Sequence, residues 1–546
     1  MKQTKRILST ALVATVLASS AGALIGCAPK VDNDEMTLEI YVANYGYGYT
    51  WVEDAIELFK EQDWVKAKYP ELKIPTPSHN SERTYTADRI TAGSTANTID
   101  LFFSCSSSAS SYFIADSSGG SYFEELTDVY NSEVPGETGV LYKDKMIDAY
   151  YEELEVEKLD GAKAYYSVPW VNGYFGLLYN KDLVESTLGA NYQLPRTTNE
   201  LAKMATDIKA ASKVPFISAA KVDYWFDIFR VWWAQYEGYD NINRYWNGLD
   251  VLGGRTWENV KQTGRLRGME TLESLIGINS GNTHSLATTM EFTTAQSKYL
   301  LGEAFMMPNG DWFENEMRET QAENPYNYDI RFMRTPIISS IIEKCTTIDN
   351  DTKLAFVVQC VDENKDYATT KAAYEAASYG TLSETDYNKI VEARKVTMNV
   401  TGHEACIPSY ATAKEPAKDF LRFLATDIAC ESMAKTTKGV SAPFEYDMQT
   451  KTPDFYNSLS NLHKSRLEIA AKSVNLRSHL TYRMQYLGGL GVIHATTGGL
   501  EAAFMSQNSD DRKSAQQIYN DDIRYFEKDN GVNWNSILVK AGYKKA

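Results

Sequence analysis

Several residue types and motifs that would place a chain of 546 residues in a common functional class are scarce or missing. Its 55 Lys and Arg are outnumbered by 72 Asp and Glu, and the net charge of −17 argues against the basic face that a nucleic-acid partner requires. Beyond Cys27 the cysteines form an odd set without CxxC spacing, which argues against a disulfide framework and a structural zinc site. A pairing of Cys345 with Cys360 across a short loop is left open. No apolar run after residue 26 is long enough to cross a membrane.

Catalytic motifs are equally hard to find. His403 and Glu404 lack the second histidine of a zinc-protease helix, and no G-x-S-x-G or Walker loop is present. Gly489 and Gly491 form only a fragment of a dinucleotide fingerprint. Carboxylates are abundant, but no pattern brings two of them together as a glycosidase would need. We therefore expect no catalytic residue, no metal and no cofactor.

Aromatic residues are plentiful, with 36 Tyr, 20 Phe and 10 Trp. Tyrosine and tryptophan are bunched between turn residues instead of following only the spacing of a core. Rings with a polar tip suit a binding surface that stays in contact with water. The composition therefore favours a binding function.

The N-terminus carries an export signal. Lys2, Lys5 and Arg6 precede an apolar stretch over residues 7–24, as in a secretory signal peptide. The sequence Leu-Ile-Gly-Cys at residues 24–27 resembles the lipobox of bacterial lipoproteins, in which the cysteine is acylated and becomes the first residue. The alternative, an uncleaved signal anchor, is disfavoured by the serine, threonine and glycine residues that dilute the run. We expect residues 1–26 to be a lipoprotein signal peptide, Cys27 the lipidation site, and residues 27–36 a tether that holds an extracytoplasmic body on the membrane.

The periodicity of the following residues predicts an α/β fold. Apolar alternation indicates strands, and apolar residues at helical spacing behind a capping box, Thr50 with Glu53, indicate a helix. A second α/β pattern contains the capping box formed by Thr197 and Glu200. The predicted elements are strands at 38–42, 72–74, 99–103, 214–218 and 304–307, and helices at 50–59, 85–92, 197–208, 294–301 and 416–428. About 520 residues exceed what one core organises, so we expect two lobes, each a mainly parallel sheet flanked by helices.

Blocks of sequence in a fixed order carry a resemblance to a known family. The blocks are YSVPW at 166–170 with LYNKDL at 178–183, LPRTT at 194–198, FMMPNGDW at 305–312 and AKDFL at 417–421. In this order they resemble the extracellular solute-binding proteins of bacterial ABC importers, in the carbohydrate-binding branch. The chain is longer than that pattern, chiefly over residues 338–400, where a Lys- and Glu-rich, helical segment is expected to intervene.

The resemblance implies a two-lobed periplasmic-binding-protein-like fold with the ligand cleft between the lobes. It places residues 37–168 and 325–430 in lobe 1, with an insertion at about 338–400, and residues 169–324 and 431–546 in lobe 2. It implies a monomeric receptor, not an enzyme, that captures a sugar or oligosaccharide and delivers it to ABC permease subunits. The alternatives are a glycan-processing extracellular enzyme and a binding protein for another solute such as a polyamine.

Residues expected at the cleft combine rings that stack on sugar faces with polar groups that bind hydroxyls. The resemblance points to Trp312 and Asp311, to Trp170, and to Asn172 with Tyr174 just after the first crossing between lobes. Tyrosines alternating with glycines after the first strand, and a serine run after the third, mark two further loops. The full set of expected ligand contacts is Tyr45, Tyr47, Tyr49, Ser107, Trp170, Asn172, Tyr174, Tyr224, Trp225, Asp311 and Trp312.

Overall fold

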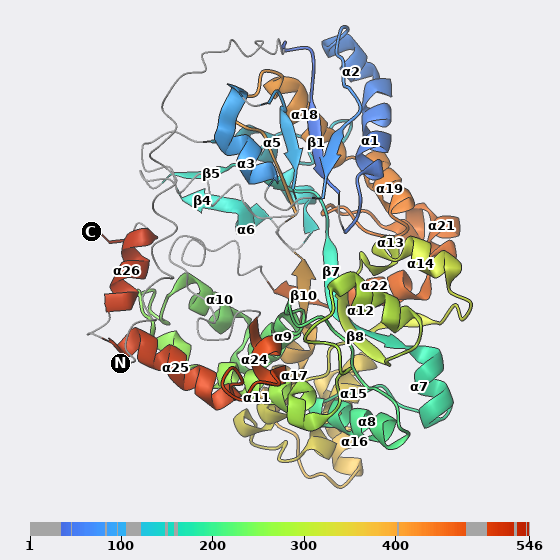
Figure 1. Cartoon of the computed structure of the whole chain (residues 1–546), viewed down its shortest axis with the longest axis vertical. Coiled ribbons are helices and arrows are strands. Elements are labelled where there is room, and N and C mark those ends of the chain that lie inside the picture. The colour runs from blue at the N-terminus through green and yellow to red at the C-terminus, as the bar shows by residue number, and fades with distance from the viewer. Residues whose placement is uncertain are drawn as a thin grey trace, which may run out of the picture.

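A computed structural model shows two α/β lobes joined by several crossings of the chain (Figure 1). The structure describes residues 34–44, 46–81, 85–95, 97–104, 122–147, 151–157, 162–400, 403–476, 499–528, 532–541 and 543–544. Each lobe is built on a sheet of five strands, and helices cover both sheets (Figure 1). The expected α/β fold class is confirmed.

The first lobe contains a sheet of order β2-β1-β3-β11-β6. Its strands are β1 (Ile40–Ala43), β2 (Ser78–Asn80), β3 (Leu101–Phe103), β6 (Val168–Pro169) and β11 (Glu404–Cys406). β1 runs parallel to both β2 and β3, as the βαβ pattern predicts, whereas β11 is antiparallel to β3 and β6. The carboxyl ends of β1 and β3 therefore lie at the same edge, where ligand loops are found in open α/β sheets.

The second lobe is organised around one long buried strand. Its strands are β7 (Gly173–Asn180), β8 (Met306–Gly310), β9 (Ile330–Met333), β10 (Val396–Val400) and β12 (Val474–Leu476). β7 pairs antiparallel with β8, β9 and β10, and only β10 with β12 is parallel. This sheet differs from the mainly parallel one expected, because strands that enter from the first lobe or return toward it run opposite to their neighbours.

The strand pairing also corrects the expected boundaries of the lobes. Residues 325–430 were assigned to lobe 1, but β9 and β10 pair with β7 and so belong to the second sheet. The chain returns to the first lobe only between β10 and β11. The added segment is helical, as expected, but it covers the second lobe with α15 (Asp351–Asp362), α16 (Tyr367–Ala376) and α17 (Glu384–Lys395).

Helices complete both lobes. Those packed on the first sheet are α1 (Thr50–Glu61), α2 (Asp63–Lys68), α3 (Tyr85–Ala92), α5 (Thr127–Tyr130), α18 (Lys414–Leu424) and α19 (Asp427–Thr436), with α6 (Tyr151–Leu154) beside the hairpin of β4 (Glu155–Glu157) and β5 (Lys163–Tyr165). Those of the second lobe are α7 (Lys181–Leu188), α8 (Thr198–Ala210), α9 (Trp225–Glu237), α10 (Tyr239–Asn247), α11 (Thr263–Ile276), α12 (Phe292–Leu300), α13 (Phe313–Glu316), α14 (Arg318–Glu323), α22 (Asn461–Ala470), α24 (Gly499–Met505), α25 (Ala515–Glu527) and α26 (Val532–Lys540). The last crossing runs through α20 (Met448–Lys451) and α21 (Pro453–Ser458). Short 3-10 turns lie at Gly93–Thr95, Lys143–Lys145, Glu258–Lys261, Ile278–Ser280 and Ser339–Lys344.

Most local predictions match these elements, with differences at their ends. Thr197 caps α8 by accepting a hydrogen bond from the backbone N–H of Glu200 at 3.2 Å, as its capping box predicts. Thr50 begins α1, but the N-cap is Tyr49 and no side chain caps that helix. The strand expected at 72–74 is only a bridge from Lys73 to Thr37, and the paired strand β2 lies further along the chain.

The described cysteines and helices bear on two further expectations. Cys345, Cys360, Cys406 and Cys430 are free thiols, so the pairing of Cys345 with Cys360 is not formed. Among the helices of the described ranges, none is both long and apolar enough to cross a bilayer.

Candidate functional site

Aromatic side chains from both lobes meet where the lobes touch. Tyr47, in the loop after β1, lies with its ring centroid 5.9 Å from Trp170, 6.0 Å from Trp312 and 5.3 Å from His403, each in edge-to-face geometry. Trp170 and His403 belong to two crossings between the lobes, and Trp312 follows β8 of the second lobe. We call Tyr47, Trp170, Phe175, Tyr224, Trp312 and His403 the junction cluster.

The loop that presents Tyr47 owes its shape to glycine. Gly46 and Gly48 have φ values of +63° and +72°, a region that other residues rarely adopt. The turn lets the carbonyl of Gly46 accept a hydrogen bond from the Asn315 side chain of the second lobe. It also directs the Tyr47 hydroxyl to Asp311, to which it donates at 2.6 Å. The two lobes are therefore joined by direct hydrogen bonds across this junction.

Trp312 is placed by the end of β8. The strand ends at Gly310, where an added Cβ would lie 2.0 Å from an atom of the Trp312 ring, so only glycine leaves room for the ring there. The side chain is 8% exposed, enclosed by Tyr47 on one side and by Phe175 and Tyr224 on the other, at 6.0 and 6.2 Å. A ring held between two lobes in this way is positioned to stack on a flat apolar ligand face.

Asp311 is the buried carboxylate of the site. It is 1% exposed, its backbone N–H donates to the carbonyl of Tyr174 at 2.9 Å, and its Oδ2 lies 3.3 Å from Nε of Arg466. Burial raises the pKa of Asp311, and Arg466 and the Tyr47 hydroxyl oppose that rise. Arg466 in turn donates to the carbonyl of Asn172 and, at 2.8 Å, to the Ser441 hydroxyl. One arginine thus connects this carboxylate to two segments that link the lobes.

Successive side chains of β7 point to opposite faces of the sheet, and this decides which aromatic residue faces the junction. Phe175 lies 6.0 Å from Trp312 and 5.4 Å from Tyr224, so it belongs to the junction cluster. Tyr174 points to the opposite face, 4.9 Å from Phe332, and burial raises its pKa far above the usual value. Tyr174 was expected to face the ligand. The next residue, Phe175, faces the junction instead, because neighbouring side chains of a strand lie on opposite faces. The alternation of this segment in the sequence was the available signal for Phe175.

Tyr224 lies in a segment that two carboxylates fix. Asp223, just before α9, caps α24, and Glu501, within α24, caps α9. Asp223 accepts hydrogen bonds from the backbone N–H groups of Leu500 and Glu501 at 3.0 and 2.9 Å, at the start of α24. Glu501 accepts from the backbone N–H of Trp225, the first residue of α9, at 2.9 Å. Burial raises the pKa of Asp223 well above its usual value and that of Glu501 to about 7. The reciprocal caps fix the segment from which the Tyr224 ring reaches Trp312.

Other predicted residues lie elsewhere. Trp225 is 0% exposed and packs against Phe216 and Trp232 at 5.3 and 6.4 Å, so it belongs to the core of the second lobe and not to the cleft. Its position as the first residue of the apolar helix α9 explains why: the ring turns inward with the buried stripe of that helix.

Trp170 is also packed more tightly than a ligand platform would be. It stacks on Trp51 at 4.9 Å and donates through Nε1 to the carbonyl of Ser104 at 2.9 Å. Tyr49 stacks on His79 at 3.8 Å within the first lobe. Tyr45, Ser107 and Cys27 lie outside the described residues.

The charge of the junction is low. Burial lowers the pKa of His403 to about 4, so its imidazole is neutral near pH 7. Within the described part of the chain, no three His, Cys, Asp or Glu side chains are grouped to hold a metal ion. What the junction cluster offers is rings, hydroxyls and one buried carboxylate, which suits binding of an uncharged polar molecule with apolar faces.

The chain is similar to known proteins in its family and in its fold. The family model described as "Bacterial extracellular solute-binding protein" matches residues 49–429. No curated protein sequence matches the chain. The fold resembles maltose-bound MalE3 of T. maritima, at 15% identity with a TM-score of 0.54, covering 89% of this chain and 99% of that one. It also resembles a chitin oligosaccharide binding protein, at 14% identity with a TM-score of 0.54, covering 92% and 99%.

A third solved structure extends the likeness. The apo form of RafE from Streptococcus pneumoniae is 13% identical with a TM-score of 0.51, covering 94% of this chain and 98% of that one. Identities this low relate the folds alone, whereas the family match spans well over half of the chain. This chain therefore belongs to the family of bacterial extracellular solute-binding proteins, and so is a binding protein and not an enzyme.

Proposed function

We propose that this protein binds a sugar or oligosaccharide between its lobes and delivers it to an ABC permease. The observation that carries the proposal is the junction cluster, where Tyr47 of one lobe faces Trp312 of the other and Asp311 lies beside both. Pyranose rings present apolar C–H faces and hydroxyls together, and rings beside a hydrogen-bond acceptor match both features. Three structures of similar fold are described as bound to maltose, as binding chitin oligosaccharides, and as preferring β-D-galactopyranose.

The mechanism follows from where the contacts lie. A ligand that touches Tyr47 and Trp312 together interacts with both lobes, so it stabilises the closed arrangement by its differential contacts. In the structure, which holds no ligand, the hydroxyl of Tyr47 donates to Asp311. A sugar hydroxyl can replace that donor, and a sugar face can replace the edge of the Tyr47 ring against Trp312. Closure is then the signal that a permease would recognise.

A panel of mono- and oligosaccharides tests the ligand class. Binding to the native state raises stability by mass action, so at least one glycan should raise the melting temperature in a saturable way. Amines and short peptides serve as controls. A panel in which only amines or peptides stabilise the protein would refute the carbohydrate assignment and leave the family membership intact.

The Trp312→Ala variant tests the site. Loss of a stacking ring should weaken the glycan by on the order of 1–3 kcal/mol, by analogy with base stacking on aromatic side chains. Trp233→Ala is the matched control, because Trp233 is buried in the second lobe and donates to Gln262 at 2.7 Å. We expect it to lower the melting temperature with little change in affinity. If Trp312→Ala keeps native affinity and only melts lower, Trp312 is a core residue.

Membrane attachment rests on Cys27, in the lipobox-like sequence at residues 24–27. Two or more acyl chains hold a protein on a bilayer stably. Replacing Cys27 with serine should release the protein into the medium or leave an uncleaved precursor, as seen by fractionation and immunoblotting. Normal processing with unchanged, detergent-dependent membrane retention would rule out lipidation.

A further inference from the structure

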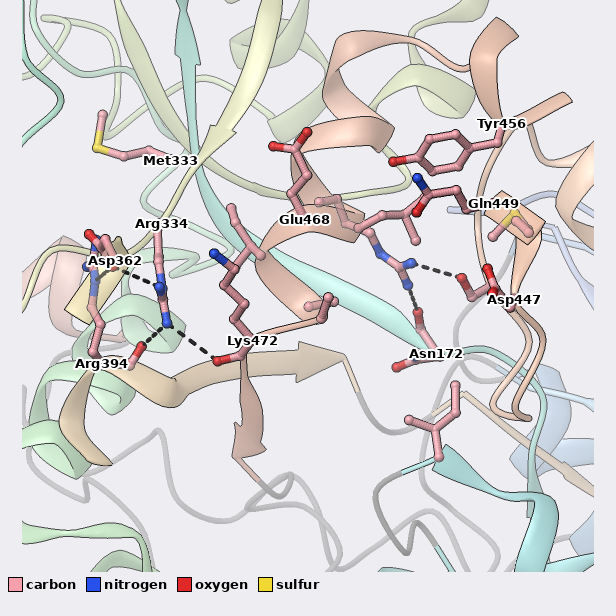
Figure 2. A pocket seen from close by; sticks show the side chains of 18 of the residues that line it. Asn172, Met333, Arg334, Asp362, Arg394, Asp447, Gln449, Tyr456, Glu468 and Lys472 are labelled. Atoms are coloured by element: carbon pink, nitrogen blue, oxygen red, sulfur yellow. Dashed lines mark hydrogen bonds and ion pairs between the residues drawn. The ribbon is translucent and has the colours of Figure 1, made fainter. Parts of the chain in front are cut away.

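A cavity lies between the lobes, away from the junction cluster. It has a volume of about 800 Å³. Ile147, Ser441 and Tyr446 line it from the side of the first lobe and its last crossing, and Arg334 and Arg394 line it from the second lobe. Figure 2 shows Arg334 and Arg394 on one side of this space and Asn172 and Asp447 on the other, with strand β7 passing behind. We call this space the hinge cavity, because residues of both lobes and of the crossings enclose it.

The hinge cavity and the junction cluster lie on different sides of β7. Phe175 faces Trp312, whereas Tyr174 faces the arginines 334, 394 and 466, whose charges act to lower its pKa. Neither Tyr47 nor Trp312 lines the hinge cavity. The connection between the two sites is Arg466, which lines the cavity and pairs with Asp311 of the junction.

One wall of the hinge cavity carries excess positive charge. Arg334 and Arg394 share a single carboxylate, Asp362, with contacts of 2.8 to 2.9 Å. Arg394 is fully engaged, since its third nitrogen donates to the carbonyl of Thr335 at 2.7 Å. Arg334 also donates from Nη2 to the carbonyls of Arg394 and Lys472, at 2.9 and 3.4 Å, and only its buried Nε has no hydrogen-bond partner. Burial, with the nearby charge of Arg394, lowers the pKa of Arg334 to about 10, as expected where compensation is incomplete.

Lys472 adds to this wall. It has no ion-pair partner among the described residues, and Figure 2 shows it beside Arg334 and Arg394. The remaining charged groups are arranged differently. Arg196 forms a bidentate pair with Glu200 at 2.6 and 3.1 Å, and Arg466 is paired with Asp311. Asp447 lies across the cavity from Arg334 and accepts a backbone hydrogen bond from Thr450, while Glu468 lies between the two sides (Figure 2).

The other walls are largely apolar. Leu194, Met333, Met448, Leu467, Ile469 and Tyr456 line the space next to the charged wall. A pocket of this size with apolar walls and a few convergent charged groups is typical of a site for a small organic molecule. The excess of guanidinium and ammonium groups at one end selects an anionic head group.

We propose that the hinge cavity is a second ligand site, for a small organic anion whose carboxylate or phosphate head binds Arg334 and Lys472 and whose apolar body lies along the remaining walls. Such a ligand would supply the second anion that the Arg334, Arg394 and Asp362 group lacks. Its binding does not depend on the sugar function. Because both lobes line the cavity, its occupant stabilises the lobe arrangement seen here, and the coupling to sugar affinity that follows rests on the proposed function.

Calorimetric titration of the purified full chain tests the site with phenylphosphate and benzoate as probes. Inorganic phosphate lacks the apolar body, and benzyl alcohol lacks the charge. We expect saturable binding of at least one aromatic anion, at least tenfold weaker binding of inorganic phosphate, and none of benzyl alcohol. Saturable binding of neither probe would overturn the proposal, and equal affinity for inorganic phosphate would overturn the role of the apolar walls.

Variants locate the binding. Arg334→Gln should weaken binding of the aromatic anion at least tenfold, and Lys472→Gln, at an exposed side chain, at least threefold. Arg331→Gln, three residues earlier in β9, is the matched control, because Arg331 pairs with Asp329 at 2.7 Å and does not line the cavity. Unchanged affinity in both Arg334→Gln and Lys472→Gln would overturn the site. If the protein binds the anion through Arg334 but binds no glycan, the hinge-cavity proposal stands and the sugar function is refuted.

Coupling gives a final readout. A saturating aromatic anion should raise glycan affinity, and the glycan should raise anion affinity by the same factor, since linkage is reciprocal. If the anion lowers glycan affinity, the anion does not stabilise the lobe arrangement in which the glycan binds, and this part of the proposal is overturned.

Discussion

Glu404 carries an ionisable carboxyl group into the centre of the first sheet. It begins β11, between β3 and β6, and is 2% exposed. Burial raises its pKa to about 7, and the nearby Ser167 opposes the rise. In the unfolded chain a glutamate titrates near pH 4.3, about its ordinary value. Between these two pH values the folded protein holds a proton that the unfolded chain has lost, so stability from this group falls as the pH rises from about 4.3 to about 7 and levels off above that.

The Glu404→Gln variant tests this sign. At pH 8 the variant should be more stable than the parent, by on the order of 1–3 kcal/mol, because it no longer buries a charge. At pH 5 the difference should shrink, since the parent carboxyl is then protonated. Chemical denaturation at both pH values gives the two differences in the free energy of unfolding.

Comparing variant with parent at each pH removes the contribution of His403 and His463, whose pKa values burial lowers to about 4 and 3 and which act in the opposite sense below pH 6.5. Glu415→Gln, at an exposed position of α18, is the control and should show no such pH dependence. A Glu404→Gln variant less stable than the parent at pH 8 would contradict the burial argument.

At the scale of elements, the N-terminal ends of α9 and α24 lie side by side and are linked by hydrogen bonds. Asp223, at φ +55°, caps α24, and Glu501 in the first turn of α24 caps α9. Gly499 has no room for a Cβ, which would lie 1.8 Å from the Asp223 carboxylate. The two helix starts therefore form one unit that carries Tyr224.

Asp223→Ala should loosen this unit. Loss of a helix cap costs about 0.5–2 kcal/mol, so we expect a lower melting temperature together with weaker glycan binding through Tyr224. Asp223→Asn keeps an acceptor and tolerates positive φ, so it should restore most of both. Asp207→Ala, at an exposed salt bridge of α8, controls for loss of a surface charge. If Asp223→Asn loses as much glycan affinity as Asp223→Ala does, loss of the helix cap is not the cause.

Local periodicity predicted the elements better than it predicted their partners. The helices α1, α3, α8, α12 and α18 were expected from apolar spacing within each segment, since that signal is local. The placement of β9 and β10 beside β7 was not, because pairing between strands more than 150 residues apart leaves no trace in either strand alone. The same reason explains the wrong assignment of residues 325–400 to lobe 1.

The candidate site shows the same division. Asp311 and Trp312 were predicted because a short block places them at the end of β8, and Tyr47 because glycines flank it, and the structure brings the three together. Tyr174 was chosen over Phe175 because a block match says nothing of which strand face meets the other lobe. Trp225 was misplaced because the composition of a helix does not fix its rotation against the sheet.

At the scale of the whole molecule, side chains of the two lobes bond directly to each other at the junction. The hydrogen bond from Tyr47 to Asp311, at 2.6 Å, and that from Asn315 to the carbonyl of Gly46 span the junction. An equilibrium between open and closed arrangements that differ by a few kcal/mol is shifted several-fold by a single such bond. The junction is therefore where small changes should have the largest effect on shape.

Tyr47→Phe removes one hydroxyl from this junction and keeps the ring. Asp311 then loses its donor while it remains buried, which costs about 1–3 kcal/mol in the closed arrangement and nothing when the lobes part. We expect a larger radius of gyration for the unliganded variant in small-angle X-ray scattering. Tyr49→Phe is the matched control, since Tyr49 lies two residues away and its ring stacks on His79 within the first lobe. If Tyr47→Phe keeps the parent radius, or if Tyr49→Phe expands the protein equally, the hydrogen bond to Asp311 does not hold the lobes together.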